Sequence, residues 1–126
     1  MAHIIDSSVF IAALHETDSQ HQRGLTLLKR APRPIIVPEY IALETATMLM
    51  IRKQKRSADQ FVEEVLRGGE FTLLLSSLSL FDAAAKLFLA SSKKLSFVDC
   101  ALIALSREYT VLTFDKALAK TIQAAQ

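Results

Sequence analysis

Four acidic residues could do chemistry, because each stands near a predicted junction between a strand and a helix. Asp6 and Asp115 follow short β-favouring stretches, Glu44 lies early in a helix that follows another such stretch, and Asp99 lies in the first turn of a further helix. In an open parallel sheet, ligands collect beyond the carboxyl ends of the strands. We therefore expect these four carboxylates to converge at one edge of a sheet.

Each acid also has a purely structural interpretation. Asp6 and Asp115 are good helix N-caps, and Ser96 and Asp99 have the spacing of a capping box. Glu44 differs, because the neighbouring helical positions in YIALETATMLMI are mostly apolar. A carboxylate on a buried face costs roughly several kcal/mol unless it is paired, hydrogen-bonded or bound to a metal. We therefore expect Glu44 to lie on a buried face and to have a functional role there.

An acidic cluster of this kind is typical of a hard-cation site. Oxygen ligands without histidine or cysteine favour Mg²⁺ or Mn²⁺, and the three histidines show no metal-ligand spacing with Cys100. A hard cation held by carboxylates can lower the pKa of a bound water and stabilise charge on a phosphate. The chemistry that this indicates is phosphodiester hydrolysis.

The elements that must position these acids alternate along the chain. Strands are expected at 3–5, 35–37, 71–75 and 110–113. Helices are expected up to about 14, over 17–30, from 38 to about 54, from 57 to about 68 after the capping-box pattern SADQ, over 79–91, and from 96 and 115. This alternation predicts an α/β fold, a three-layer α/β/α sandwich with a mainly parallel central sheet of four to five strands.

Composition sets wider limits. The 126 residues, 51% of them hydrophobic and 22% charged, predict one domain spanning 1–126 with a real core. The net charge of +2 is compatible with a nucleic-acid partner. Cys100 is the only cysteine, the N-terminus lacks a secretory pattern, and the longest apolar stretch is interrupted by Asp82 and Lys86. We therefore expect a cytoplasmic protein that does not span a membrane.

Four stretches together resemble the PIN-domain family, and most closely its VapC-type toxin branch. They are IIDSSVFIA, PEYIALETATML, LSFVDCALIAL and VLTFDKAL, and their order and separation match across nearly the whole chain. The resemblance implies a parallel sheet between helices and a ribonuclease that depends on Mg²⁺ or Mn²⁺. It also implies an RNA substrate, an antitoxin protein that covers the acidic site, and a homodimer.

The resemblance also assigns roles by position. Asp6 and Asp99 would be the most direct metal ligands, whereas Glu44 and Asp115 would complete the catalytic site, directly or through water. Ser8 and Thr113 match polar positions beside the first and last acids and could orient carboxylates by hydrogen bonds. The pattern departs from many relatives after Asp115, where Lys116 and Leu118 stand in place of a second acid and an aromatic residue.

Other motifs are less specific. The D-x-x-H at Asp18 and His21 resembles a family feature at a helix start, which we interpret as structural. Cys100 is expected to be a small buried side chain rather than a nucleophile.

Two groups of basic residues are candidates for RNA contacts. The stretch RKQKR at 52–56 includes Arg52 and Lys53, which are equally well explained as a solvated helix end. Lys93 and Lys94 stand just before the helix of Asp99 and are the closer candidates.

Two other functions remain open at this point. The first is a catalytically inactive PIN fold that binds RNA or protein. The second is a phosphatase related to the haloacid dehalogenases, whose nucleophilic Asp also ends the first strand. The second is the less favoured, because that family needs another Asp two residues on, where this chain has Ser8.

Overall fold

The structure is a computed structural model, and it describes residues 1–92 and 94–126. A four-stranded, entirely parallel sheet in the order β3-β2-β1-β4 forms its centre. The strands are β1 (His3–Ile5), β2 (Ile35–Pro38), β3 (Phe71–Leu74) and β4 (Thr110–Leu112). The prediction of a mainly parallel sheet of four to five strands is therefore confirmed, and the described residues form four strands.

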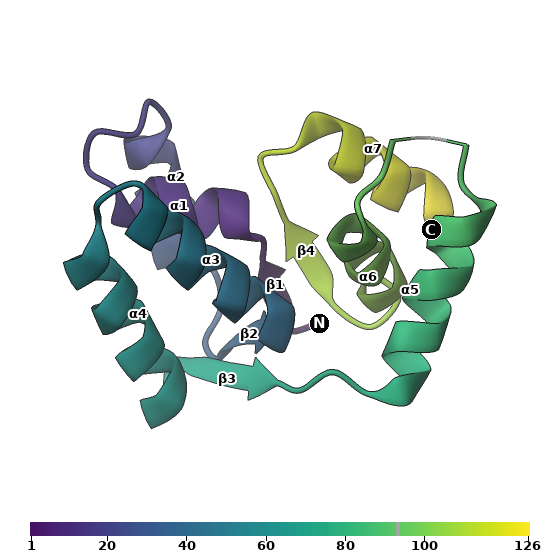
Figure 1. Cartoon of the computed structure of the whole chain (residues 1–126), viewed down its shortest axis with the longest axis horizontal. Helices are drawn as coiled ribbons and strands as arrows, with labels where there is room; N and C mark the ends of the chain where they lie inside the picture. Colours follow the sequence, from purple (N-terminus) through teal and green to yellow (C-terminus); the bar gives the residue numbers. More distant parts are fainter. Residues whose placement is uncertain (93) are drawn as a thin grey trace.

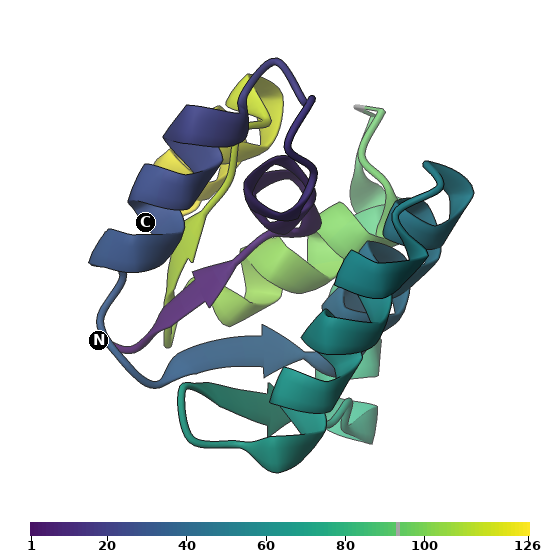
Figure 2. The same ribbon diagram turned by 90° about the vertical axis from the view of Figure 1, so that its left-hand side faces the viewer.

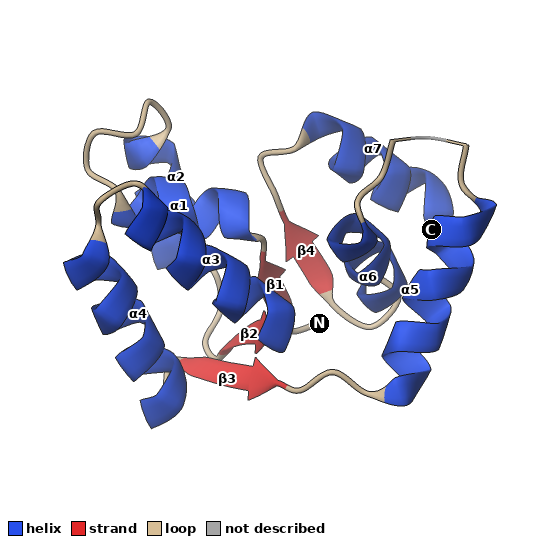
Figure 3. Ribbon diagram, in the orientation of Figure 1, coloured by secondary structure: helices blue, strands red, loops and turns tan. Residues whose placement is uncertain are grey.

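Seven helices in the described part of the chain surround this sheet (Figures 1 and 3). They are α1 (Ser7–Leu14), α2 (His21–Arg30), α3 (Glu39–Ile51), α4 (Lys55–Arg67), α5 (Leu78–Ala90), α6 (Phe97–Leu105) and α7 (Lys116–Ala125). Figure 1 shows α1 to α4 on one side of the molecule and α5 to α7 on the other. The α/β fold predicted from the alternation of elements is therefore confirmed.

Strand pairing sets the position of the acidic edge. Ile5, the last residue of β1, pairs with Leu112 at the end of β4, and the next backbone N–H, that of Asp6, donates to the Leu112 carbonyl at 2.9 Å. The two strands thus end level with each other, and Figure 2 shows them side by side. Asp6 and the segment after β4 consequently begin side by side.

The two central strands, β1 and β2, are mostly buried because they are apolar on both faces, as expected for parallel strands covered by helices. Ile4, Ile5, Ile35 and Val37 are fully buried and belong to one core cluster with Phe10. The Phe10 ring makes edge contacts with two further phenyl rings of the same cluster, from Phe61 and Phe71. This core fixes the strand ends that carry the site.

Three predicted helix starts differ from the structure. The capping-box pattern at 57–60 is wrong as a helix start, because α4 begins at Lys55 and Ser57 lies inside it. The helix expected from 17 begins at His21, after a turn in which Asp18 accepts from the backbone N–H of Gln20. Pro38 is the last residue of β2 and the N-cap of α3 rather than a residue of its first turn.

None of the helices in the described residues is both long and apolar enough to cross a membrane.

Candidate active site at the acidic edge of the sheet

Asp6 is the centre of the site. Its side chain is buried and both carboxylate oxygens accept hydrogen bonds. Oδ1 accepts from the backbone N–H of Ser7 at 2.7 Å, while Oδ2 accepts from the hydroxyls of Thr113 at 2.7 Å and Ser8 at 3.3 Å. These donors come from α1 and from the segment after β4, so the fold itself holds the carboxylate in place.

Burial raises the pKa of the Asp6 carboxyl above its ordinary value, and the negative charge of Asp99 raises it further. The hydrogen bonds from Thr113, Ser7 and Ser8 act in the opposite direction, but they do not reverse the shift. Such a carboxylate is short of positive charge in its surroundings. A cation placed beside it would stabilise the ionised carboxylate and so offset the effect of burial.

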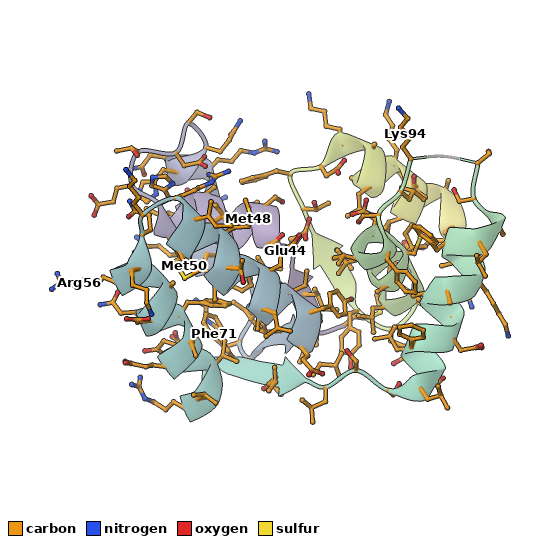
Figure 4. All side chains as sticks on the ribbon, viewed as in Figure 1. Glu44, Met48, Met50, Arg56, Phe71 and Lys94 are labelled. Carbon is orange, nitrogen blue, oxygen red and sulfur yellow. The ribbon has the colours of Figure 1, made fainter. Side chains whose placement is uncertain are left out.

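Glu44 lies close to Asp6 but not in the surroundings that its neighbours predicted. The expectation of a buried face is wrong: the buried residues of α3 are Ile41, Thr45 and Leu49, and Glu44 is exposed. Figure 4 shows it between α3 and β4. Its Oε2 accepts a hydrogen bond of 2.8 Å from the Ser7 hydroxyl, whose oxygen lies 3.4 Å from Asp6 Oδ1. One hydroxyl therefore separates the two carboxylates.

Asp115 is joined to Asp6 through Thr113. The Thr113 hydroxyl donates to Asp6 and accepts from the backbone N–H of Asp115 at 3.0 Å. The side chain of Asp115 caps α7 by accepting from the Leu118 N–H at 3.0 Å. Asp115 is thus the N-cap of α7, and its second carboxylate oxygen, Oδ2, takes no part in the capping hydrogen bond.

Asp99 acts on Asp6 through its negative charge, whereas its own hydrogen bonds are with Ser96. It forms the expected capping box at the start of α6: its backbone N–H donates to Ser96 Oγ at 3.0 Å, and its Oδ2 accepts from the Ser96 N–H at 3.1 Å. Its negative charge is one of the causes of the raised pKa of Asp6. Asp99 therefore caps a helix and lies near enough to Asp6 to disfavour its ionisation.

The donor set suits a hard divalent cation. Asp6, Glu44, Asp99 and Asp115 offer carboxylate oxygens alone, which Mg²⁺ and Mn²⁺ prefer. Across residues 1–92 and 94–126, no three acidic, histidine or cysteine side chains are grouped tightly enough to coordinate one ion as they stand. Mg²⁺ commonly binds through one or two carboxylates and keeps several waters, so the arrangement fits the ion.

Cys100 follows Asp99 and is fully buried, as expected. Burial raises the pKa of its thiol, and the charge of Asp99 adds to the shift. The thiolate is therefore disfavoured, which argues against a nucleophilic role.

Three of the four basic candidates for RNA contact belong to the described residues, and their surroundings differ. Arg52 is held by an ion pair of 3.0 Å with Asp18, and Lys53 is an exposed residue of the turn between α3 and α4. Lys94 is exposed in the segment before α6, where Figure 4 labels it. Lys93 lies outside the described residues.

Two residues of the site were not among the sequence candidates. Ser7 bridges Asp6 and Glu44, although the sequence only indicated a helix start there. Tyr40, at the start of α3, has a buried hydroxyl without a hydrogen-bond partner in the described part of the chain. Burial raises the pKa of Tyr40, and the charge of Asp6 raises it further, so the phenol stays protonated beside that acid.

Comparison with known proteins places this chain in a family. The model of the PIN domain matches residues 3–122, so the chain belongs to the PIN-domain family. A crystal structure of VapC20 from Mycobacterium tuberculosis, described as a toxin that cleaves the sarcin–ricin loop, has a similar fold. The TM-score is 0.85 at 19% sequence identity, and 94% of each chain is covered. A search of curated proteins found no match.

Proposed function

We propose that this chain is an endoribonuclease that depends on Mg²⁺ or Mn²⁺ and hydrolyses RNA phosphodiester bonds at Asp6, Glu44, Asp99 and Asp115. The observation that carries the proposal is the state of Asp6, a buried carboxylate with both oxygens hydrogen-bonded and a pKa raised by burial and by Asp99. Membership of the PIN-domain family supports a nuclease, and residues 1–126 would form its single domain.

Each acid would act through the position that it holds. Asp6, fixed by Thr113 and Ser8, and Asp99, fixed by its capping box, would bind the cation most directly. The cation, when bound, would supply charge stabilisation at the phosphate and a water of lowered pKa. Glu44 is exposed and has one oxygen held by Ser7, so its other oxygen is placed to orient the attacking water and accept its proton.

The direct test is cleavage of labelled RNA with Mg²⁺, with Mn²⁺ and with EDTA. The substrates would be a tRNA and a hairpin carrying the sarcin–ricin loop, the second chosen because VapC20 is described as cutting that loop. We expect cleavage with either metal, none with EDTA, and losses of at least about a thousandfold in Asp6→Asn and Asp99→Asn. No cleavage of either RNA, with no metal bound, would instead support an inactive binding module.

We also propose that the chain is the cytoplasmic toxin of a toxin–antitoxin pair and that it forms a homodimer. Two groups of exposed apolar side chains support the proposal of two protein partners. Single exposed apolar residues are ordinary, whereas a group of them on one surface marks an interaction site. The first, on α3 and α4, would take the antitoxin, and Figure 4 labels Met50 on it. It consists of Leu43, Met50, Ile51, Val62 and Leu66.

The second surface, on α5 and the start of α6, would meet a second copy of the chain. Its centre is a row of three phenyl rings, with Phe97 between Phe81 and Phe88 at centroid distances of 5.2 Å on each side. Leu78 and Leu89 extend it and are more than four-fifths exposed.

The mass in solution, measured by light scattering, shows which of the two surfaces forms the homodimer. Phe81→Asp should reduce the mass in solution from two chains to one, whereas Leu66→Asp, on the other surface, should leave it unchanged. A monomeric native chain would contradict the homodimer. If Leu66→Asp alone abolished the dimer, the surface on α3 and α4 would be the dimer interface and the surface on α5 and α6 would take the antitoxin.

A further inference from the structure

We propose that Arg23 contacts a backbone phosphate of the RNA substrate beside the acidic site. This assignment rests on the nuclease function proposed above and adds a substrate-binding residue to it. Arg23 is an exposed residue of α2, a helix that carries none of the four acids, and its guanidinium carbon lies 4.5 Å from the centroid of the Phe114 ring.

Phe114 brings this cation to the site. It stands between Thr113, which donates to Asp6, and Asp115, which caps α7. Its own backbone N–H donates to the Ser8 hydroxyl at 3.2 Å, and that hydroxyl donates to Asp6 Oδ2. One phenyl ring thus separates the guanidinium of Arg23 from the hydrogen-bonded segment that holds Asp6.

The helix that carries Arg23 is held firmly against α1. A Cβ on Gly24 would lie 2.7 Å from the backbone nitrogen of Ala13 and 3.1 Å from the carbonyl oxygen of Val9, so only glycine permits this close approach. His21 Nδ1 lies 2.8 Å from the Ala12 carbonyl oxygen, which ties the first turn of α2 to the same helix. Because α1 follows directly from Asp6, the backbone of Arg23 has a fixed position relative to the acid.

The guanidinium of Arg23 lies over a ring and forms no ion pair among the described residues, so it can bind an anion. A guanidinium above an aromatic ring still has its N–H groups in its own plane, where they can form two hydrogen bonds to a phosphate. Among the described residues Arg23 forms no ion pair, whereas Arg52 is paired with Asp18. A cation without an ion-pair partner, one phenyl ring away from the segment that holds Asp6, suits a polyanion that must approach that acid.

The test measures binding of labelled tRNA and of the sarcin–ricin hairpin, by fluorescence anisotropy over a series of salt concentrations. All chains carry Asp99→Asn so that the RNA is not cut. Arg23→Ala should weaken binding about threefold to tenfold and reduce the slope of log K against log salt by about 0.7 to 0.9, the loss of one phosphate contact. Arg107→Ala, which removes an exposed arginine before β4, at the end of that strand opposite to Asp115, should change neither.

Two further variants separate a phosphate contact from a purely structural stack. Arg23→Lys keeps the charge, so the salt slope should stay while affinity falls in part. Phe114→Leu removes the ring but keeps the cation, so the slope should again stay. Equal losses of affinity in Arg23→Ala, Arg23→Lys and Phe114→Leu, with lowered melting temperatures, would overturn the proposal, because all three remove the stack.

The outcomes for Arg23 and for the nuclease are distinguishable. Native affinity and salt slope in Arg23→Ala would overturn the phosphate contact and leave the nuclease standing. Cleavage absent from the native chain, together with the expected binding loss in Arg23→Ala, would overturn the nuclease alone. An absence of RNA binding by the Asp99→Asn chain would overturn the role of Arg23.

Discussion

Asp6 and Asp99 stand at the starts of two helices, but the protein holds them in different ways. Asp6 is buried and receives hydrogen bonds from α1 and from the segment after β4, so its position depends on the packed fold. Asp99 is only partly buried, and its capping box with Ser96 lies within one helical turn. One acid is positioned by tertiary structure and the other by local structure, and perturbing each should have different consequences.

The largest effect should follow from removing the tertiary support of Asp6. Thr113→Val deletes the 2.7 Å hydrogen bond to Oδ2, and we expect metal affinity and cleavage to fall about tenfold to a hundredfold, as for other groups that orient metal ligands. Ser8→Ala deletes the longer bond of 3.3 Å and should have a smaller effect. Cleavage rates at saturating RNA and at a fixed metal concentration below saturation of the native chain test the pair. A native rate in Thr113→Val would contradict the tertiary support.

A smaller effect should follow from removing the local support of Asp99. Ser96→Ala deletes half of the capping box and should lower the free energy of unfolding by about 1 kcal/mol. Ser57→Ala is the matched control, because Ser57 belongs to a capping-box pattern that lies inside α4 and should cost nothing measurable. Urea unfolding of the two variants checks this. Equal losses would show that the capping box at Ser96 does not stabilise α6.

The burial of Asp6 predicts a dependence of stability on pH. Its pKa in the folded chain lies above the value of 3.8 expected when the chain unfolds, so its ionisation destabilises the fold at neutral pH. This destabilisation is lost as the pH falls through the folded-state pKa. With EDTA present, any stability that Asp6→Asn gains over the native chain should therefore shrink as the pH falls toward 3.8. A difference that stays constant with pH would contradict the raised pKa.

The smallest effect concerns the link between the two acids. The charge of Asp99 is the last of the causes that raise the pKa of Asp6, and burial is the first. Asp99→Asn should therefore lower the pKa of Asp6 only slightly, leaving it above its ordinary value. Titration of the Asp6 carboxyl carbon by NMR would measure this. A return of the pKa to the ordinary value would mean that charge, rather than burial, controls it.

Local patterns in the sequence predicted the strands well and the site in part. Short apolar stretches identified the four strands of the described residues, and the S-x-x-D spacing at Ser96 identified a true capping box. The same spacing failed at Ser57, because the turn before α4 is closed by backbone hydrogen bonds to α3, including one of 2.8 Å from the Gln54 N–H to the Leu49 carbonyl. A capping pattern cannot show whether the helix has already begun.

The error at Glu44 has a different cause. Helix α3 carries apolar residues on almost every side, so its sequence does not show which face is buried. Leu43 and Met50 are exposed in the structure, whereas Ile41 and Leu49 form the core. The role of Arg23 could not be predicted either, because it depends on the close approach of α2 to α1 at Gly24 and on the distant Phe114.

The central claim is that Asp6 and Asp99 hold one divalent cation together. Calorimetric titration of the metal-free chain with Mn²⁺, without RNA, tests it directly, with Glu63→Gln as a control that removes an exposed acid of α4. We predict binding by the native chain and by Glu63→Gln, and affinity at least about tenfold weaker in both Asp6→Asn and Asp99→Asn. Equal Mn²⁺ affinity in all four chains would contradict the claim.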